Sequence, residues 1–198
     1  MTKVIFATSN EGKMKEIREI LSDMDIELLS LKDAGLNPDI EENGVTFEEN
    51  AVIKAKAVME LSGEIVLADD SGLEVDYMDK APGVYSARFM GEDTSYQIKN
   101  QYIIDQLAAA QEEERSARFV CVIACAFPDG TMLTRRATVE GCIAKHISDG
   151  PTGFGYDPIF FVPEYNMTMA NMTADLKNTI SHRGKALRAM KELIKEKL

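Results

Sequence analysis

The sequence has no long hydrophobic run and no surplus of positive charge, and both absences exclude classes of protein. No stretch approaches the roughly 20 apolar residues that a membrane-spanning helix needs. The formal net charge is −11, from 22 basic and 33 acidic residues. Binding to a nucleic acid depends largely on neutralising phosphates, so this charge disfavours a nucleic-acid surface. It does not exclude a mononucleotide, because one triphosphate needs only a few local cations and a divalent ion.

Several familiar site patterns are also missing. Cys121, Cys125 and Cys142 are odd in number and lack the paired spacing of a zinc site or a redox motif, so we expect reduced thiols packed as small hydrophobic side chains. There is no P-loop, no dinucleotide-binding glycine fingerprint, no HExxH motif and no Ser-centred nucleophile elbow. The first residues run into a short apolar strand without a signal-peptide pattern, and we therefore expect a cytoplasmic protein.

What remains is the composition of an ordinary globular protein, with 45% hydrophobic and 28% charged residues. The length of 198 residues suits one large domain or two small lobes. Periodicity and turn residues predict, in chain order, a strand at 3–8, a helix with its apolar stripe at 14–21, a strand at 26–29, a helix at 46–61, a strand at 65–68, a helix opening at Asp93 or Thr94 and ending near 111–116, a hairpin of 117–127 and 131–145, and a terminal helix capped by Ser181. Crossovers combined with a hairpin indicate an α/β protein with a mixed sheet.

Two neighbouring carboxylates follow the strand at 65–68. On an extended backbone Asp69 and Asp70 would diverge, but we expect Ser71-Gly72 to break the strand and let both approach one site. A plain strand-ending turn is the alternative. Magnesium takes one or two protein carboxylates together with water and phosphate oxygens. Asp70 and Glu42 fit that pattern if the polar loop 32–45 folds over the strand end, although Glu41 and Glu42 are also typical of solvated charge.

The turn after the first strand is a second place of interest. Thr8, Ser9 and Asn10 lie between a strand and a helix, and Lys13 lies in the first helical turn. Unpaired backbone N–H groups and the helix dipole at such a position favour anions.

Other cations occur further along the chain. A single surface lysine is usually a solvated charge, but Lys54 has apolar residues on its packed side and therefore needs an anionic partner, for which a phosphate would serve. Lys177 precedes His182 and Arg183, which open the last helix and are better functional candidates than the strand-end His146.

The loop 153–158 is the most selective element of the sequence. Glycines on both sides of Phe154 allow the backbone to approach a flat ligand closely, and the ring offers a stacking face for a base. Asp157 can accept hydrogen bonds from a base or orient a cation. The alternative is a glycine-rich turn whose aromatic side chains fill the core.

With these residues assembled, the chain resembles the inosine/xanthosine triphosphate pyrophosphatase family, whose members remove non-standard purine nucleotides from the nucleotide pool. The resemblance runs nearly end to end and is carried by Thr8-Ser9-Asn10 with Lys13, Thr46-Phe47-Glu48-Glu49-Asn50-Ala51 with Lys54-Ala55, Ala68-Asp69-Asp70-Ser71-Gly72-Leu73, Ala81-Pro82-Gly83-Val84-Tyr85-Ser86-Ala87-Arg88, Gly153-Phe154-Gly155-Tyr156-Asp157-Pro158 and Ser181-His182-Arg183. Lys80 and Leu176 depart from the family pattern without touching an expected contact.

The resemblance implies a fold, a reaction and a set of residue roles. The fold would be one two-lobed α/β domain over 1–198, with an elongated mixed β-sheet flanked by helices and an active-site cleft between the lobes, assembled as a homodimer. The reaction would be Mg²⁺-dependent cleavage of ITP, dITP and XTP to the monophosphate and pyrophosphate. By motif, the triphosphate would be held by Thr8, Ser9, Asn10, Lys13, Lys54 and Lys177, the metal by Glu42 and Asp70, and the nucleoside by Ser71, Phe154, Gly155, Tyr156, Asp157, His182 and Arg183. Asp70 would also act as the general base, with Lys54 beside it in catalysis.

A nucleotide-binding regulatory protein that keeps the pocket without hydrolysis is the runner-up interpretation. The presence of both Asp70 and Glu42 disfavours it, because a binding protein has little need of a metal-organising pair. Base choice would follow from groups suited to a 6-oxo purine, since each mispaired buried polar group costs about 1–3 kcal/mol.

Overall fold

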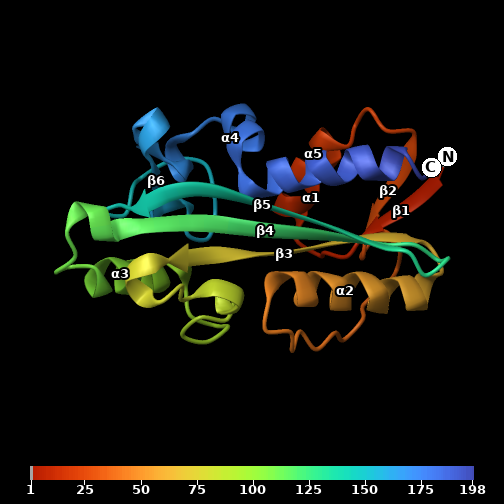
Figure 1. Cartoon of the computed structure of the whole chain (residues 1–198), viewed down its shortest axis with the longest axis horizontal. Helices are drawn as coiled ribbons and strands as arrows, with labels where there is room; N and C mark the ends of the chain where they lie inside the picture. The colour runs from red at the N-terminus through yellow and green to blue at the C-terminus, as the bar shows by residue number, and fades with distance from the viewer. Residues whose placement is uncertain (1) are drawn as a thin grey trace. The chain divides into compact units, whose positions relative to one another are not determined.

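The computed structural model describes residues 2–198 and has an α/β fold (Figure 1). Its strands are β1 (Thr2–Phe6), β2 (Ile26–Ser30), β3 (Ile65–Val75), β4 (Ser116–Ala126), β5 (Met132–Ile143), β6 (Phe160–Val162) and β7 (Met167–Thr168). Its α-helices are α1 (Glu11–Ile20), α2 (Phe47–Ser62), α3 (Tyr96–Gln106), α4 (Ala174–Ile180) and α5 (His182–Lys195). The predicted α/β class is confirmed.

The strands form a mixed sheet in the order β2-β1-β3-β4-β5-β6-β7. β1 pairs in parallel with both β2 and β3, with Val4 opposite Leu28 on one side and Ile65 on the other. β6 pairs antiparallel with β5 and with β7. The expectation of a mixed rather than purely parallel sheet is therefore confirmed.

The chain divides into two compact units. Unit 1 comprises the residues up to Asp70, then Cys121–Ala137 and His182–Leu198, while unit 2 comprises Ser71–Val120 and Thr138–Ser181. β3, β4 and β5 each contribute residues to both units.

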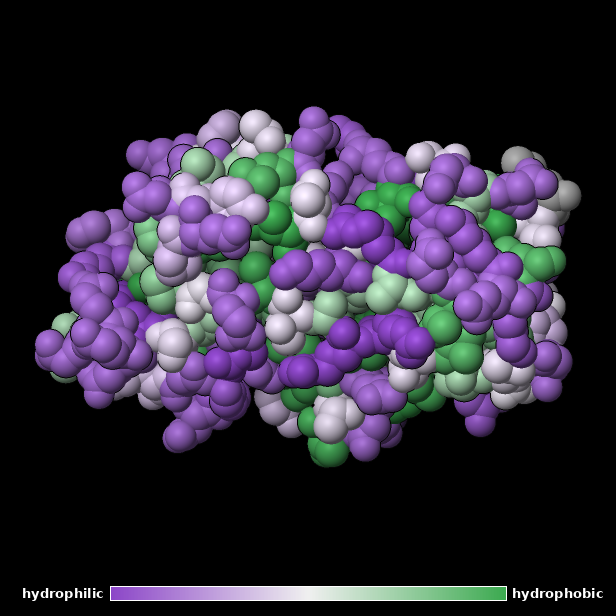
Figure 2. Space-filling view, turned by 45° about the horizontal axis from the view of Figure 1, so that its top comes forward, coloured by the Kyte–Doolittle hydropathy of each residue, from purple (hydrophilic) through white to green (hydrophobic). Residues whose placement is uncertain are grey.

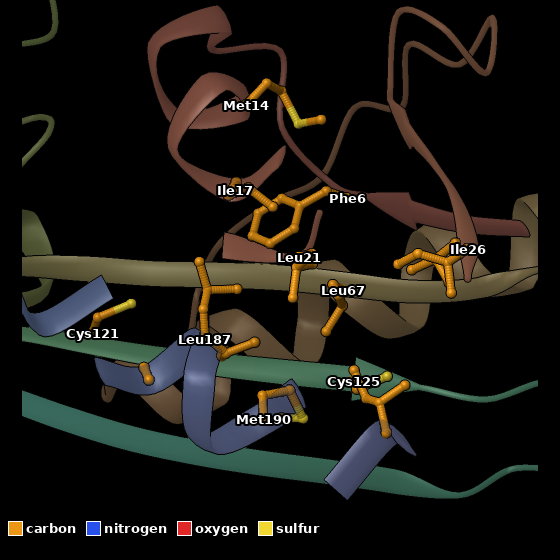
Figure 3. Close-up of a cluster of buried hydrophobic side chains, with 14 of the residues drawn as sticks. Phe6, Met14, Ile17, Leu21, Ile26, Leu67, Cys121, Cys125, Leu187 and Met190 are labelled. Carbon is orange, nitrogen blue, oxygen red and sulfur yellow. The ribbon is translucent and has the colours of Figure 1, made fainter. Parts of the chain in front are cut away.

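Unit 1 has its own hydrophobic core, built between the strands and two helices. Figure 1 shows α1 and α5 along one side of the strands and α2 along the other. Figure 3 shows the cluster under α1 and α5, where Met14 and Ile17 meet Phe6, Leu67 and Leu187. Because side chains alternate along β4, Cys121 and Cys125 point into this cluster as buried free thiols, as the sequence predicts.

Unit 2 has a separate core between its strand segments and α3. The cluster includes Leu73 and Val75 of β3, Ile103 and Leu107 at the end of α3, and Phe160 of β6, all of them fully buried. This core lies under the loop 153–158, because Tyr156 and Ile159 belong to it.

Local capping chemistry sets several helix boundaries. A capping box begins α2: the Thr46 hydroxyl accepts from Glu49 N, and the Glu49 carboxylate accepts from Thr46 N. Gly63 ends α2 with a φ of 69°, a left-handed conformation that glycine adopts without strain. The Asn10 side chain accepts from Lys13 N and so begins α1.

Two boundary predictions were wrong. β3 does not end at Ala68 but runs on to Val75, because Leu73 and Val75 continue the buried alternation past Ser71-Gly72. The helix expected from Asp93 or Thr94 begins at Tyr96, capped by the Ser95 hydroxyl, and ends at Gln106. The terminal helix α5 begins at His182, directly after Ser181 as predicted, and Ser181 is also the C-cap of α4, a short helix that the sequence did not indicate.

Much of the surface is polar. The face drawn in Figure 2 is mostly hydrophilic, with hydrophobic side chains in small groups. Among residues 2–198, no helix combines the length and the hydropathy needed to cross a bilayer.

Candidate functional site

Successive side chains alternate in direction along β3, so its two aspartates, Asp69 and Asp70, contact different residues. Asp69 is buried and contacts Lys13 and Arg183, whereas Asp70 contacts Lys54. The expected break at Ser71-Gly72 does not occur, so the divergence of adjacent side chains on an extended strand holds. The two carboxylates therefore take different roles.

Asp69 belongs to a network that includes Lys13, Arg183 and Glu16. Lys13 Nζ lies 3.0 and 2.9 Å from the two Asp69 carboxylate oxygens. Arg183 Nε lies 3.4 Å from Asp69 Oδ2, and Arg183 Nη1 donates to Glu16 Oε2 at 2.8 Å. Burial alone would raise the pKa of Asp69, but the charges of Lys13 and Arg183 outweigh it and hold that pKa well below its usual range. Asp69 is thus an ionised structural anion.

Helix α1 supplies both of its contacts to this network from one face. Lys13 and Glu16 are three residues apart in the helix, so their side chains project in similar directions. Burial would lower the pKa of Arg183, yet Asp69 and Glu16 together raise it. Glu16 is a site residue that the sequence reasoning missed, and its position one helical turn after Lys13 was the available signal.

Asp70 belongs to a second cluster in unit 1. Lys54 Nζ lies 2.9 Å from Glu42 Oε2 and 3.5 Å from Asp70 Oδ1, so one ammonium joins the two carboxylates. Asp70 Oδ2 is buried and has no hydrogen-bond partner among residues 2–198. Burial raises the pKa of Asp70 to about 6; Lys54 opposes that rise, while Glu42 and Asp69 add to it.

The loop that carries Glu42 is anchored to α2. Asn50 is buried on that helix, and its side-chain oxygen accepts from Gly44 N at 2.8 Å. This contact holds the segment just after Glu42 against the helix that carries Lys54. The sequence predicted that Glu42 and Asp70 could act together if the polar loop 32–45 folds over the strand end. In the structure Lys54 contacts both Glu42 of that loop and Asp70.

The pair of Glu42 and Asp70 fits a magnesium ion. Residues 2–198 contain no group of three or more His, Cys, Asp or Glu side chains arranged to hold a metal. Magnesium does not require such a cage, because one or two carboxylates with water and substrate phosphates satisfy it. The buried, unpartnered Oδ2 of Asp70 is a carboxylate oxygen ready for a cation. Asp69 has both oxygens engaged by Lys13, and Glu41 is exposed.

The loop 153–158 forms a third cluster, in unit 2. Phe154 keeps 44% of its surface exposed, and Lys177 Nζ lies 4.7 Å from the centre of its ring. Lys177 also donates to Asp157 Oδ2 at 2.9 Å, and the same oxygen accepts from Phe154 N at 2.8 Å. Of the two roles considered for Asp157, orienting a cation is the one seen, and that cation is Lys177.

The glycines of this loop are required by its geometry. Gly153 has a φ of 95°, and a Cβ there would lie 2.7 Å from Asp157 Oδ2. Gly155 has a φ of 67°. The core-filling alternative is wrong for Phe154 but describes Tyr156, which is 4% exposed and donates from its hydroxyl to Ser86 O at 2.7 Å. A ligand can therefore meet the ring of Phe154 and the backbone of Tyr156, not the Tyr156 ring.

The remaining predicted residues lie as follows. Thr8 is half-buried and its hydroxyl accepts from Asn10 N at 3.2 Å, while Ser9 and Asn10 are exposed at the start of α1. Ser71 is half-buried in β3, and His182 is buried at the start of α5. Lys177 lies with Asp157 and Phe154 of unit 2, and its contact with a triphosphate stays a prediction.

Comparison with known proteins gives consistent results. The Ham1 family model matches residues 4–193. A dITP/XTP pyrophosphatase of Clostridium perfringens is 47% identical over 201 residues, covering 98% of this chain and 98% of that protein. The structure of a HAM1 protein from Coxiella burnetii has a TM-score of 0.91 at 39% identity and covers 99% of this chain and 100% of its own. The Staphylococcus aureus Ham1 protein gives a TM-score of 0.90 at 36% identity, with 100% of both chains covered.

Proposed function

The chain belongs to the Ham1 family, and on that premise we propose that it is a nucleoside-triphosphate pyrophosphatase that converts dITP, XTP and ITP to the monophosphate and pyrophosphate. The observation that carries the proposal is the arrangement around Asp70. One of its carboxylate oxygens is buried without a hydrogen-bond partner among residues 2–198, and the other lies 3.5 Å from Lys54 Nζ, which also pairs with Glu42. Carboxylates in such a position can hold a divalent cation and accept a proton from water.

In the proposed reaction, water attacks the α-phosphorus and the bond from the α-phosphorus to the bridging oxygen breaks. Asp70 accepts the proton of the attacking water, and pyrophosphate leaves with the bridging oxygen. Glu42 and Asp70 would hold Mg²⁺, whose charge would stabilise the phosphate oxygens. Lys54 and Lys13 would neutralise the same negative charge; in the structure each ammonium group pairs with a carboxylate, Lys54 with Glu42 and Lys13 with Asp69.

The nucleoside would be bound by the loop 153–158. Phe154 offers a partly exposed ring on which a base could stack. The ammonium group of Lys177 lies over the same ring, in the position of a cation–π contact. Asp157 fixes that ammonium at 2.9 Å and fixes the loop through Phe154 N. Ser71, His182 and Arg183 complete the proposed nucleoside site, and Thr8, Ser9, Asn10 and Lys177 the proposed triphosphate site.

The wider setting is also part of the proposal. We infer one domain of two lobes over 1–198, a homodimer in the cytoplasm, and no nucleic-acid or membrane partner. The support is the family resemblance, the charge of −11 and the division into two units.

The test is a hydrolysis assay on the purified protein. Incubation with dITP, XTP, ITP or ATP should release pyrophosphate from the first three in preference to ATP, and EDTA should abolish release until Mg²⁺ is added in excess. Release of orthophosphate in place of pyrophosphate would contradict the proposed bond cleavage. Tight binding of XTP without any release would favour a nucleotide-binding regulatory protein.

A further inference from the structure

Helix α3 contributes a buried amide to the loop 153–158. Asn100 is 2% exposed, and its Nδ2 donates to Gly155 O at 3.0 Å. Since a carbonyl oxygen can only accept, this contact fixes which end of the amide faces the loop. Asn100 Oδ1 is then left with no hydrogen-bond partner among residues 2–198.

Asn100 acts from a rigid face of α3. Tyr96, Lys99 and Asn100 occupy positions i, i+3 and i+4, which lie together on a helix. The Tyr96 ring meets the Tyr156 ring edge-on at 5.1 Å, and Lys99 Nζ lies 4.9 Å from the Tyr96 ring while donating to Ala87 O at 2.7 Å. The side chains around Asn100 are thus themselves fixed.

The bond to Gly155 O determines the direction of a neighbouring donor. In a planar trans peptide the C=O and the following N–H point in opposite directions. Because the Gly155 carbonyl points to α3, the Tyr156 N–H points away from α3. That N–H makes no hydrogen bond within residues 2–198. Gly155, at a φ of 67°, adopts the left-handed conformation without strain, and Tyr156, at a φ of −93°, would need a positive φ if the peptide were reversed. The bond from Asn100 Nδ2 adds to this backbone preference and holds the observed orientation.

We propose that Asn100 is a positioning residue that sets the preference for 6-oxo purines, by holding the Gly155–Tyr156 peptide with its N–H toward the base. The inference rests on the proposed function. A 6-oxo purine carries an acceptor at position 6 and pairs with an N–H donor, whereas adenine carries an amino donor there and would be left unpaired. If the peptide were reversed, its carbonyl would face the base and would suit adenine instead.

The amide at this position pairs with the Gly155 carbonyl but leaves its own Oδ1 without a hydrogen-bond partner among residues 2–198. Leucine has nearly the same size and would fill the same space without an unpartnered Oδ1. With Asn at this position the Gly155 carbonyl has a donor, while Asn100 Oδ1 has none. This difference makes Asn100→Leu an informative variant, because it separates packing from peptide orientation.

The experiment compares Asn100→Leu and Asn100→Asp with the wild type. In Asn100→Asp an oxygen replaces the donor that faces Gly155 O and repels that carbonyl. The readouts are kcat/KM for dITP and dATP, the Kd for dIMP and dAMP, which carry the two bases and no scissile bond, and the inhibition constant of inorganic tripolyphosphate. Gln101→Leu is the control, since Gln101 is the next residue on α3 and is exposed.

We expect the preference for the 6-oxo base to fall about tenfold in both Asn100 variants, in kcat/KM and in Kd. Tripolyphosphate inhibition should stay within twofold, and the Tm of Asn100→Leu should fall by no more than the few degrees that one unsatisfied carbonyl costs. Gln101→Leu should match the wild type. Unchanged Kd ratios for dIMP and dAMP in Asn100→Leu would overturn the role of Asn100. Since those ligands are not hydrolysed, this result is independent of whether the wild type releases pyrophosphate, which tests the proposed function.

Discussion

Replacing Asp70 by Asn is expected to abolish hydrolysis while stabilising the folded protein at neutral pH. The amide cannot accept the proton of the attacking water and does not balance the charge of Mg²⁺. It also removes an ionised group from a site where burial raises the pKa of the carboxyl to about 6. Lys54 keeps a partner in the variant, because Glu42 lies 2.9 Å from its Nζ.

The size of the stabilisation follows from the pKa of Asp70. A rise from 3.8 to about 6 is roughly two pKa units, and one unit corresponds to about 1.4 kcal/mol. The free energy of unfolding of the variant should therefore exceed that of the wild type by on the order of 1–3 kcal/mol. For a chain of this length each kcal/mol corresponds to about 2–4 °C in Tm.

The sign of the pH dependence is fixed by which state holds the proton. Below about pH 4 the carboxyl is protonated in both states, so wild type and variant should be equally stable. Between pH 4 and 6 the unfolded wild type releases its proton first, and the wild type loses stability relative to the variant. Above pH 6 the difference should be constant.

Thermal unfolding of both proteins in EDTA from pH 4 to 8 measures this effect, with Asp39→Asn as the control because Asp39 is exposed. Added Mg²⁺ should then raise the Tm of the wild type and not that of Asp70→Asn, since a cation that binds only the folded state stabilises it. Near-normal pyrophosphate release by Asp70→Asn, or a Tm below wild type at pH 7, would refute the reasoning.

Three further substitutions give separate outcomes. Lys54→Met should lower kcat/KM for dITP by at least a hundredfold. It should also lower the Tm above pH 6, because Asp70 then loses its counter-charge, and a pH series of melting curves that shows no such fall would contradict this. Arg183→Ala should destabilise the fold by about 3–5 kcal/mol in urea unfolding, because Asp69 stays buried with Lys13 as its remaining cation of the network, and an unchanged midpoint would contradict this. Phe154→Ala should weaken binding of dIMP and dAMP by similar factors, since stacking is nearly blind to base identity, whereas a loss confined to dIMP would place base discrimination on the ring.

Much of the fold was predictable because its determinants are local. The Thr46–Glu49 capping box and the Gly63 stop both follow from residues close in sequence. The prediction failed at β3, where Ser71-Gly72 looks like a strand end. Burial of Leu73 and Val75 in the core of unit 2 extends the strand, and that core is assembled from segments distant in the chain.

In the candidate site, too, the features that depend on residue type were predictable, and the contacts between residues distant in the chain were not. The residue types and positions of Glu42, Lys54 and Asp70 indicated a metal and phosphate site before any contact was known. The partners of Arg183 were not predictable, because it pairs with Asp69, 114 residues away, and with Glu16, 167 residues away. A guanidinium at the start of a helix reads equally well as a ligand contact or as half of a buried ion pair. Burial of 95% of the Arg183 side chain between two carboxylates assigns it first to the ion pair.

Asn100 is the extreme case of this limit. A single Asn in the middle of α3 carries no sequence pattern of its own, and helix interiors disfavour the residue slightly. Its meaning comes only from the approach of the Gly155 carbonyl, which lies 55 residues further along the chain. Charged residues among apolar ones stand out in a sequence, because burying a charge costs free energy unless a partner is present. A residue that only orients a backbone peptide can be recognised once the backbone structure is known. Base selectivity that depends on a peptide orientation is therefore the part of this protein that composition and motif are least able to predict.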